Sequence, residues 1–154
     1  MNVEEVSAVV VDAGFQLHRG LGPGLLESVY EVVLARMLDR RGLRVERQQS
    51  IPFEFDGMHF DAGLRVDLLV EDCLVVELKS VEALAPVHSK QLLTYLRLLE
   101  LPVGLLINFG APTFRQGVKR VVNKHHDFAS SRLRVNIQPG PTRIREEHEG
   151  DGAG

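Results

Sequence analysis

Apolar residues recur every three or four positions in two stretches at the start of the chain. In residues 3–19 this spacing predicts a helix, and two apolar residues off the main stripe, Val11 and Phe15, predict that it is largely buried. Residues 20–24, Gly-Leu-Gly-Pro-Gly, end this helix. A second helix is predicted over residues 24–41. Its apolar stripe consists of Leu26, Val29, Val33, Leu34, Met37 and Leu38.

Shorter apolar segments with strand character follow the two helices. Residues 45–49 and 51–55 predict a strand that continues past Pro52, and the proline indicates a sheet edge or a bend. Asp56-Gly57 is typical of a two-residue hairpin turn, so residues 58–70 should form the partner strand. Within that strand a glycine at position 63 indicates a bulge.

The second half of the chain alternates between strand and helix. Residues 73–79 and 103–109 are apolar runs of the buried-strand type. Between them, residues 86–100 carry leucines at helical spacing. Short strands are also predicted at residues 118–122 and 133–137. The buried stripe of the intervening helix is expected to be Leu92, Leu93, Leu96 and Leu99.

The order helix, helix, strand, strand, strand, helix, strand indicates an α/β fold with a mixed central sheet flanked by helices. A chain of 154 residues suits one domain, which we place at residues 1–137. Residues 138–154 are rich in Gly, Pro and charge, so they are expected to form a disordered tail.

The formal net charge is −3 at pH 7, so no overall positive field attracts nucleic acid to the protein. Any such contact must come from local basic clusters, although a basic cluster is more often a solvated face. The two clusters are Arg40, Arg41, Arg44 and Arg47, and Arg115, Lys119, Arg120 and Lys124.

Cys73 is the only cysteine, which excludes an internal disulfide, and its apolar neighbours predict a buried, unreactive thiol. The first residues are acidic where a signal peptide would be basic. No apolar run approaches the length of a membrane span. We therefore expect a cytoplasmic protein that makes no membrane contact.

Three hydrophilic residues interrupt two of the predicted buried strands: Asp67, Glu77 and Lys79. Glu77 and Lys79 are two positions apart, so they share one sheet face. A three-residue loop between the strands would pair Val70 with Leu74 and bring Asp67 opposite Glu77. A two-residue loop would send Asp67 to the other face. We predict the three-residue loop or an equivalent bulge.

Two carboxylates on neighbouring strands are typical ligands of a hard divalent cation such as Mg²⁺. Such an ion acidifies a bound water and stabilises charge on a phosphate, and Lys79 beside it would orient the attacking water or screen the developing charge. The alternative is that Glu77 and Lys79 form an exposed ion pair, which contributes at most about 1 kcal/mol.

The residues Asp67 and Glu77-Leu78-Lys79 resemble the signature of the PD-(D/E)xK nuclease superfamily, with Val66 in place of the proline. Downstream, Gln91-Leu92-Leu93-Thr94-Tyr95 resembles the QxxxY motif of its RecB-like branch. Gln91 and Tyr95 are four residues apart, so they lie on one face of a helix.

Two further segments carry the resemblance, which covers roughly residues 5–123. Gly24-Leu25-Leu26-Glu27-Ser28-Val29-Tyr30 matches the GxxExxY motif that names a small bacterial family of this superfamily. Asn108-Phe109-Gly110, after the last core strand, is similar as well.

The resemblance implies a restriction-endonuclease-like core. It also implies a site in which Glu27 joins Asp67 and Glu77 as a ligand of Mg²⁺ or Mn²⁺, and in which Gln91 and Tyr95 touch phosphate or nucleotide. On the residues alone, Glu27 would be a solvated residue of a first helical turn, and Tyr95 would be a core residue.

The histidines have two interpretations each. His18 and His88 would assist the metal or contact phosphate, or would serve as helix caps or surface groups. The remaining histidines, His59, His125, His126 and His148, lack the spacing of zinc ligands.

The leading hypothesis is a metal-dependent nuclease that acts on nucleic acid, with DNA as the expected substrate and a homodimer as an expected assembly of this fold. Its catalytic residues would be Asp67, Glu77, Lys79, Gln91 and Tyr95. The second hypothesis is a catalytically silent module that retains the fold and binds nucleic acid or protein. A third, a purely structural partner protein, predicts no metal binding.

Overall fold

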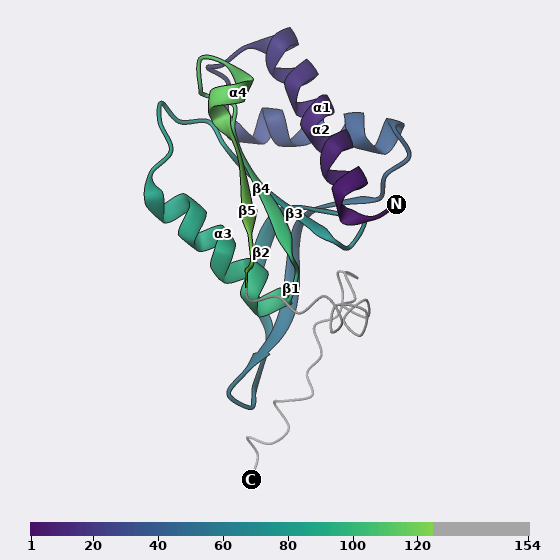
Figure 1. The fold of residues 1–154 in the computed structure, drawn as a ribbon, viewed down its shortest axis with the longest axis vertical. Coiled ribbons are helices and arrows are strands. Elements are labelled where there is room, and N and C mark those ends of the chain that lie inside the picture. The colour runs from purple at the N-terminus through teal and green to yellow at the C-terminus, as the bar shows by residue number, and fades with distance from the viewer. Residues whose placement is uncertain (125–154) are drawn as a thin grey trace.

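The computed structural model of the protein describes residues 1–124, in which one five-stranded sheet forms the centre (Figure 1). The strands are β1 (Val45–Phe55), β2 (Met58–Val70), β3 (Leu74–Lys79), β4 (Val103–Asn108) and β5 (Val118–Val122). They lie in the order β1-β2-β3-β4-β5. β3 and β4 are parallel and the other pairs are antiparallel, which is the predicted mixed sheet. The predicted strand at 133–137 and the predicted tail lie outside the described residues.

Helices cover both faces of this sheet (Figure 1). They are α1 (Val3–Leu21), α2 (Glu27–Arg40), α3 (Pro86–Leu99) and α4 (Phe114–Gly117). α1 and α2 pack against one face and α3 packs against the other, and each face has its own apolar cluster. The short α4 was not predicted; it is one turn begun by Thr113, whose hydroxyl accepts a hydrogen bond from the Gln116 N–H. None of the helices within residues 1–124 is long and apolar enough to cross a membrane.

The apolar face predicted for α2 was wrong at its N-terminal end. Leu26 lies before the helix and is 74% exposed, and Val29 is also exposed. The first turn instead buries Tyr30 and Glu31, and the helix continues inward through Leu34. The pattern missed this because a tyrosine and a glutamate, each with specific hydrogen-bond partners, occupy positions that apolar spacing would not assign to the core.

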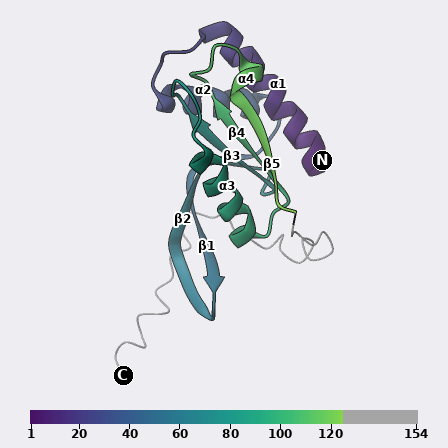
Figure 2. The same ribbon diagram turned by 60° about the vertical axis from the view of Figure 1, so that its left-hand side comes forward.

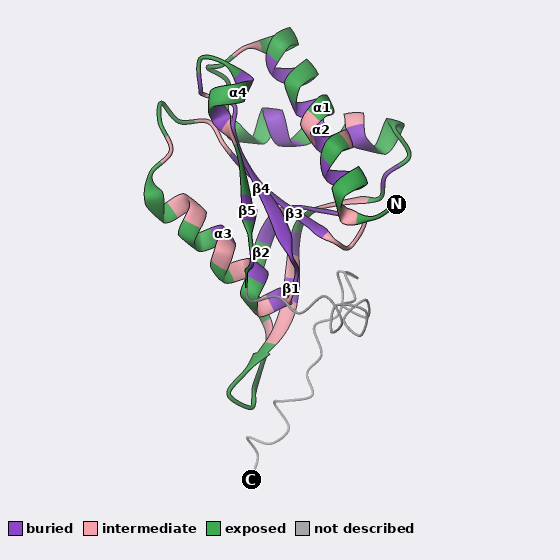
Figure 3. Ribbon diagram, in the orientation of Figure 1, coloured by how far each residue is buried: buried purple, intermediate pink, exposed green. Residues whose placement is uncertain are grey.

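The β1–β2 hairpin was predicted closely. Phe55 pairs with Met58 across Asp56-Gly57, and β1 is an edge strand, as its proline indicated. The register shifts between Ile51 and Phe53, near Gly63 of the partner strand. A Cβ at Gly63 would lie 2.8 Å from the Phe53 ring, so the close packing requires glycine there. The outer part of the hairpin projects from the body of the protein (Figure 2), and its tip is exposed whereas β3 and β4 are buried (Figure 3).

The turn between β2 and β3 has the predicted three-residue length. Val70 pairs with Leu74 across Glu71, Asp72 and Cys73. Cys73 itself is half-buried rather than fully buried. Burial, reinforced by the two acidic neighbours, raises the pKa of its thiol to about 11, so the group remains protonated and unreactive at neutral pH.

Candidate active site beside the end of β3

Asp67 on β2 and Glu77 on β3 hold each other in place. Continuing the observed register by one residue places them opposite each other. The Asp67 N–H donates a 2.9 Å hydrogen bond to Glu77 Oε2, and the Leu78 N–H donates a 2.8 Å bond to Asp67 Oδ2. Side-chain carboxylates thus replace carbonyls in the ladder at this point. The two acids consequently lie side by side with fixed orientations.

The strand alternation breaks where Asp67 lies. Val66 packs in the apolar cluster beneath α3, whereas Leu68 packs in the cluster beneath α1 and α2. Regular alternation would place these two residues on the same face. Opposite Asp67, the backbone of Gln48 has a left-handed φ of 52°. The two strands are therefore distorted together beside the acids.

Glu77 is only 7% exposed, so it is not part of an exposed ion pair. The pKa of its carboxyl is raised to about 8, mainly by burial and then by the charge of Asp67, while the Asp67 N–H and the ammonium of Lys79 oppose the rise. Within residues 1–124, no salt bridge forms between Glu77 and Lys79. The exposed-pair alternative therefore does not describe this site.

Lys79, the last residue of β3, is half-buried and lies near two acids. Its positive charge lowers the pKa values of both Glu27 and Glu77. An ammonium between carboxylates from two elements can donate to a water or to an incoming anion on the same side of the sheet.

Hydrogen bonds fix the segment that leads into α2 and to Glu27. The Tyr30 hydroxyl donates a 2.6 Å bond to the Gly22 carbonyl and accepts a 3.1 Å bond from the Leu25 N–H. Ser80 Oγ donates a 2.6 Å bond to the Leu25 carbonyl, which joins this segment to the residue after β3. Gly24 has a φ of 110°, a conformation that other residues rarely adopt.

Glu27 itself is exposed, yet its carboxyl interacts electrostatically with charged residues of the sheet. Partial burial raises its pKa; Lys79 lowers it, and Asp67 raises it. Three carboxylates from α2, β2 and β3 therefore interact electrostatically with one another.

The segment Asn108-Phe109-Gly110 is structural. The Asn108 side chain accepts a 3.0 Å bond from the Val81 N–H and donates a 2.9 Å bond to the Val81 carbonyl. Phe109 stacks on Tyr30 with ring centroids 4.6 Å apart. At Gly110 a Cβ would lie 2.3 Å from the Val81 carbonyl oxygen. These contacts support the chain just after Lys79 without presenting a reactive group.

Gln91 and Tyr95 lie on one face of α3, as their spacing predicted. Gln91 Nε2 donates a 3.0 Å bond to the Tyr95 hydroxyl. Burial raises the pKa of Tyr95, and the charge of Glu77 raises it further. The phenol is therefore a hydrogen-bond donor on the same side of the sheet as Glu77.

The histidines have mainly structural contacts. His18 Nε2 donates a 2.8 Å bond to the Ala111 carbonyl, and its ring stacks on Phe109. His88 Nδ1 accepts a 3.0 Å bond from the Ala85 N–H at the start of α3. His59 pairs with acids on the hairpin. His125, His126 and His148 lie outside the described residues.

Most arginines of the first basic cluster are neutralised within the protein. Arg41 pairs with Asp12 at 2.7 Å, Arg44 pairs with Asp72, and Arg47 pairs with Glu31 at 3.1 Å. In the second cluster, Arg120 makes two hydrogen bonds to Glu4. The solvated-face interpretation suits these residues better than a continuous anion-binding surface.

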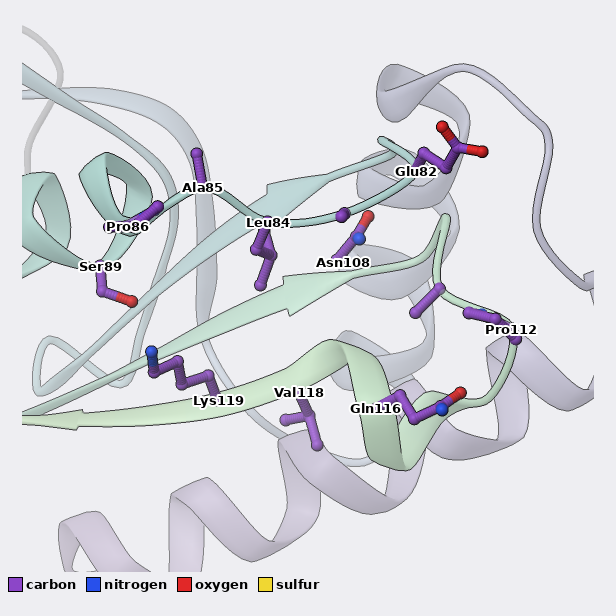
Figure 4. A pocket seen from close by; sticks show the side chains of 12 residues that line it. Glu82, Leu84, Ala85, Pro86, Ser89, Asn108, Pro112, Gln116, Val118 and Lys119 are labelled. Atoms are coloured by element: carbon purple, nitrogen blue, oxygen red, sulfur yellow. The ribbon is translucent and has the colours of Figure 1, made fainter.

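A pocket of about 500 Å³ lies apart from the acids, between the loop before α3 and β5 (Figure 4). Asn108, Gln116 and Lys119 contribute polar groups to it, and neither Asp67 nor Glu77 lines it. The candidate chemistry therefore lies on the interior strands β2 and β3, distinct from this hollow.

The carboxylates suit Mg²⁺ or Mn²⁺ by their chemistry, because oxygen ligands are those that hard divalent cations prefer. Burial, and to a lesser extent repulsion by neighbouring acids, raises the pKa values of Glu27 and Glu77, and a bound cation would favour their charged forms. In residues 1–124, however, no group of three or more acidic, histidine or cysteine side chains is arranged to hold an ion. Asp67 and Glu77 therefore fit as a pair of ligands, with Glu27 farther away.

Two residues that the sequence patterns did not single out also belong to this region: Glu31 and Gln48. Glu31 is buried on α2 and accepts hydrogen bonds from Arg47 Nε and Gln48 Nε2. The one available signal was its position four residues after Glu27, which places both acids on one side of the helix.

Comparison with known proteins identifies the family. The family model described as the PD-(D/E)XK nuclease superfamily matches residues 4–121. No curated protein and no solved structure matches the chain. The match covers most of the chain, all five strands included except the last residue of β5. The paired acids beside Lys79 and the α/β fold around them thus have a common explanation: the chain belongs to the PD-(D/E)XK nuclease superfamily.

Proposed function

We propose that the protein is a metal-dependent nuclease that hydrolyses phosphodiester bonds in nucleic acid, with DNA as the substrate to test first. The observation that carries the proposal is the pair of hydrogen bonds that fixes the two acids, from the Asp67 N–H to Glu77 and from the Leu78 N–H to Asp67. Lys79 lies two positions after Glu77 and, within residues 1–124, forms no salt bridge with either acid. Membership of a nuclease superfamily supports the same reaction class.

In this proposal Asp67 and Glu77, with Glu27 as a further carboxylate, would hold Mg²⁺ or Mn²⁺. When bound, that ion supplies charge neutralisation on the phosphate and acidifies a water. Glu77 must lose its proton first, because a neutral carboxyl is a poor ligand. The raised pKa of Glu77 makes this step sensitive to pH near neutrality.

Lys79 and the α3 pair would act on the substrate. The Lys79 ammonium would orient the attacking water or screen charge on the phosphate. The Tyr95 hydroxyl and the Gln91 amide, which bond to each other, would donate to phosphate oxygens. These roles are those of the QxxxY branch, and the hydrogen bonds of Tyr30 support assignment to the GxxExxY family within it.

The test is cleavage of single- and double-stranded DNA and RNA by the purified protein with Mg²⁺ or Mn²⁺. Glu77→Ala and Lys79→Ala are the inactive controls, and Glu54→Ala, on the exposed hairpin, is the matched control that should retain activity. We expect cleavage by the wild type and by Glu54→Ala alone. Equal product from the wild type and Glu77→Ala on every substrate would refute catalysis by this site.

One observation favours the second candidate, a catalytically silent module that binds nucleic acid or protein. Arg41, Arg44 and Arg47 are engaged by acids of the same chain, and the net charge is −3, so neither this cluster nor the overall charge favours attraction of a nucleic acid. Calorimetry with Mn²⁺ and DNA titrations across salt separate the candidates. DNA binding with a steep salt dependence but without cleavage would support the silent module. Gel filtration at several concentrations tests the homodimer.

A further inference from the structure

A hydrogen-bonded path links α2 to Asp67 through Gln48, a residue with no role in the chemistry proposed above. Gln48 Nε2 lies 2.7 Å from Glu31 Oε1 and 3.3 Å from Asp67 Oδ1. Both partners are carboxylate oxygens, which accept hydrogen bonds when ionised. The nitrogen of the amide must therefore face them, and it donates one N–H to each.

The backbone of Gln48 adopts a conformation that is unusual for a β-strand. Its φ of 52° lies in the left-handed region, in the middle of β1, where glutamine is disfavoured. Such a conformation persists only where the surroundings over-determine it. Here its side chain is anchored by Glu31, which is 5% exposed and also accepts a 3.1 Å bond from Arg47.

The consequence for Asp67 is that both of its oxygens are held. Oδ2 accepts from the Leu78 N–H at 2.8 Å, and Oδ1 accepts from Gln48. A carboxylate held at both oxygens cannot rotate freely, so its remaining lone pairs point in fixed directions. Replacement of a residue that orients a metal ligand in this way commonly weakens the affinity for the ion.

We propose that Gln48 is a positioning residue that, anchored by Glu31, orients the Asp67 carboxylate for the divalent cation. The proposal rests on the function proposed above. It also explains why one helix carries both Glu27 and Glu31: α2 supplies a candidate ligand and, one turn later, the anchor that orients another ligand.

Two substitutions separate the side chain of Gln48 from its backbone. Gln48→Gly removes the amide and accepts the positive φ without strain. Gln48→Asn also tolerates the left-handed region, but its side chain is one methylene too short to bridge Glu31 and Asp67. Asp56→Gly is the matched control, because Asp56 has a φ of 53° at the hairpin turn, far from the acids in the fold.

Calorimetric titration with Mn²⁺ and thermal unfolding without metal are the two measurements. We expect Gln48→Gly and Gln48→Asn to bind Mn²⁺ about 10- to 100-fold more weakly than the wild type. The unfolding temperature of Gln48→Gly should stay the same or rise, and Asp56→Gly should leave Mn²⁺ affinity unchanged. A purely structural role for Gln48 predicts the reverse: a lower unfolding temperature with unchanged Mn²⁺ affinity, which would overturn the proposal.

The failure of this inference is distinguishable from failure of the proposed function. If the wild type takes up neither Mn²⁺ nor Mg²⁺, the nuclease proposal fails, and crystal structures of the metal-free wild type and Gln48→Gly then decide the role of Gln48. An Asp67 carboxylate that turns away from its wild-type position in the variant supports the positioning role. An Asp67 carboxylate in the same position in both structures refutes it.

Discussion

The Tyr30 ring lies parallel to the Phe109 ring, with 4.6 Å between centroids and 4° between planes. This stack joins the first turn of α2 to the segment after β4. It leaves the Tyr30 hydroxyl directed at Gly22 and Leu25, two residues of the loop that leads to Glu27. Two segments that are far apart in the chain, around Tyr30 and around Phe109, therefore pack together and hold the loop that leads to Glu27.

Tyr30→Phe should retain the stack and lose both hydroxyl bonds. We expect a loss of about 1–2 kcal/mol in the free energy of unfolding, because the Gly22 carbonyl and the Leu25 N–H both lose a part-buried hydrogen bond. Cleavage should fall further than stability explains, because the loop before Glu27 is no longer fixed. Urea unfolding and the initial cleavage rate measure the two effects. A rate equal to that of the wild type would show that this loop does not position Glu27.

Two glycine substitutions should differ sharply in cost. Gly110→Ala brings a Cβ to 2.3 Å from the Val81 carbonyl oxygen, a backbone atom that cannot move alone, so we expect destabilisation of about 2–4 kcal/mol. In Gly104→Ala the Cβ meets flexible Leu92 methyl groups at 2.9 Å, so the cost should be about 1–2 kcal/mol. Thermal unfolding compares them. Equal costs would mean that the loop around Val81 adjusts freely.

Glu77 should make the protein less stable as the pH rises. Its pKa of about 8 in the folded protein exceeds the ordinary value of 4.5, so between these limits the folded state holds a proton that the unfolded state has released. The free energy of unfolding therefore falls as the pH rises through about 8. We expect a loss of a few kcal/mol, because a tenfold change in proton affinity corresponds to about 1.4 kcal/mol.

Glu77→Gln is the variant that isolates this effect, because its side chain has nearly the same shape and does not titrate. The difference in unfolding free energy between the wild type and Glu77→Gln should change steadily between about pH 5 and about pH 8.5. A difference that is constant with pH would mean that Glu77 keeps an ordinary pKa in the folded state.

Uptake of Mn²⁺ should have the opposite pH dependence. Because the ion needs the charged carboxylate, affinity should rise with pH until Glu77 is fully ionised, by up to about tenfold per pH unit for the one proton released. Calorimetry in two buffers of different ionisation enthalpy measures the released proton directly. Affinity that is flat between about pH 6 and about pH 8.5 would exclude Glu77 as a ligand that must deprotonate.

The sheet could be predicted because its signals are local. The Asp56-Gly57 turn and the proline of β1 encode the hairpin and its place at the edge, and both were confirmed. The three-residue loop after Val70 followed from requiring Asp67 and Glu77 to share a face, and the observed pairing confirms it.

Other features depend on contacts that no local pattern records. The burial of Tyr30 and Glu31 on α2 follows from partners in β1 and in the loops, so apolar periodicity assigned the wrong face to the first turn. The distortion at Gln48 is likewise invisible in the sequence, because glutamine rarely adopts a left-handed conformation without tertiary support. Contacts between residues far apart in the sequence determine the buried face of α2 and the backbone conformation at Gln48.

The projecting hairpin offers a site for engineering. Its tip at Asp56-Gly57 lies beyond the last packed aromatic pair, Phe53 and Phe60, and its neighbours are exposed. Exposed turns of this kind accept inserted sequence with little cost to the rest of a domain. A fluorescent reporter or an affinity tag inserted there would label the protein and leave Asp67 and Glu77 undisturbed.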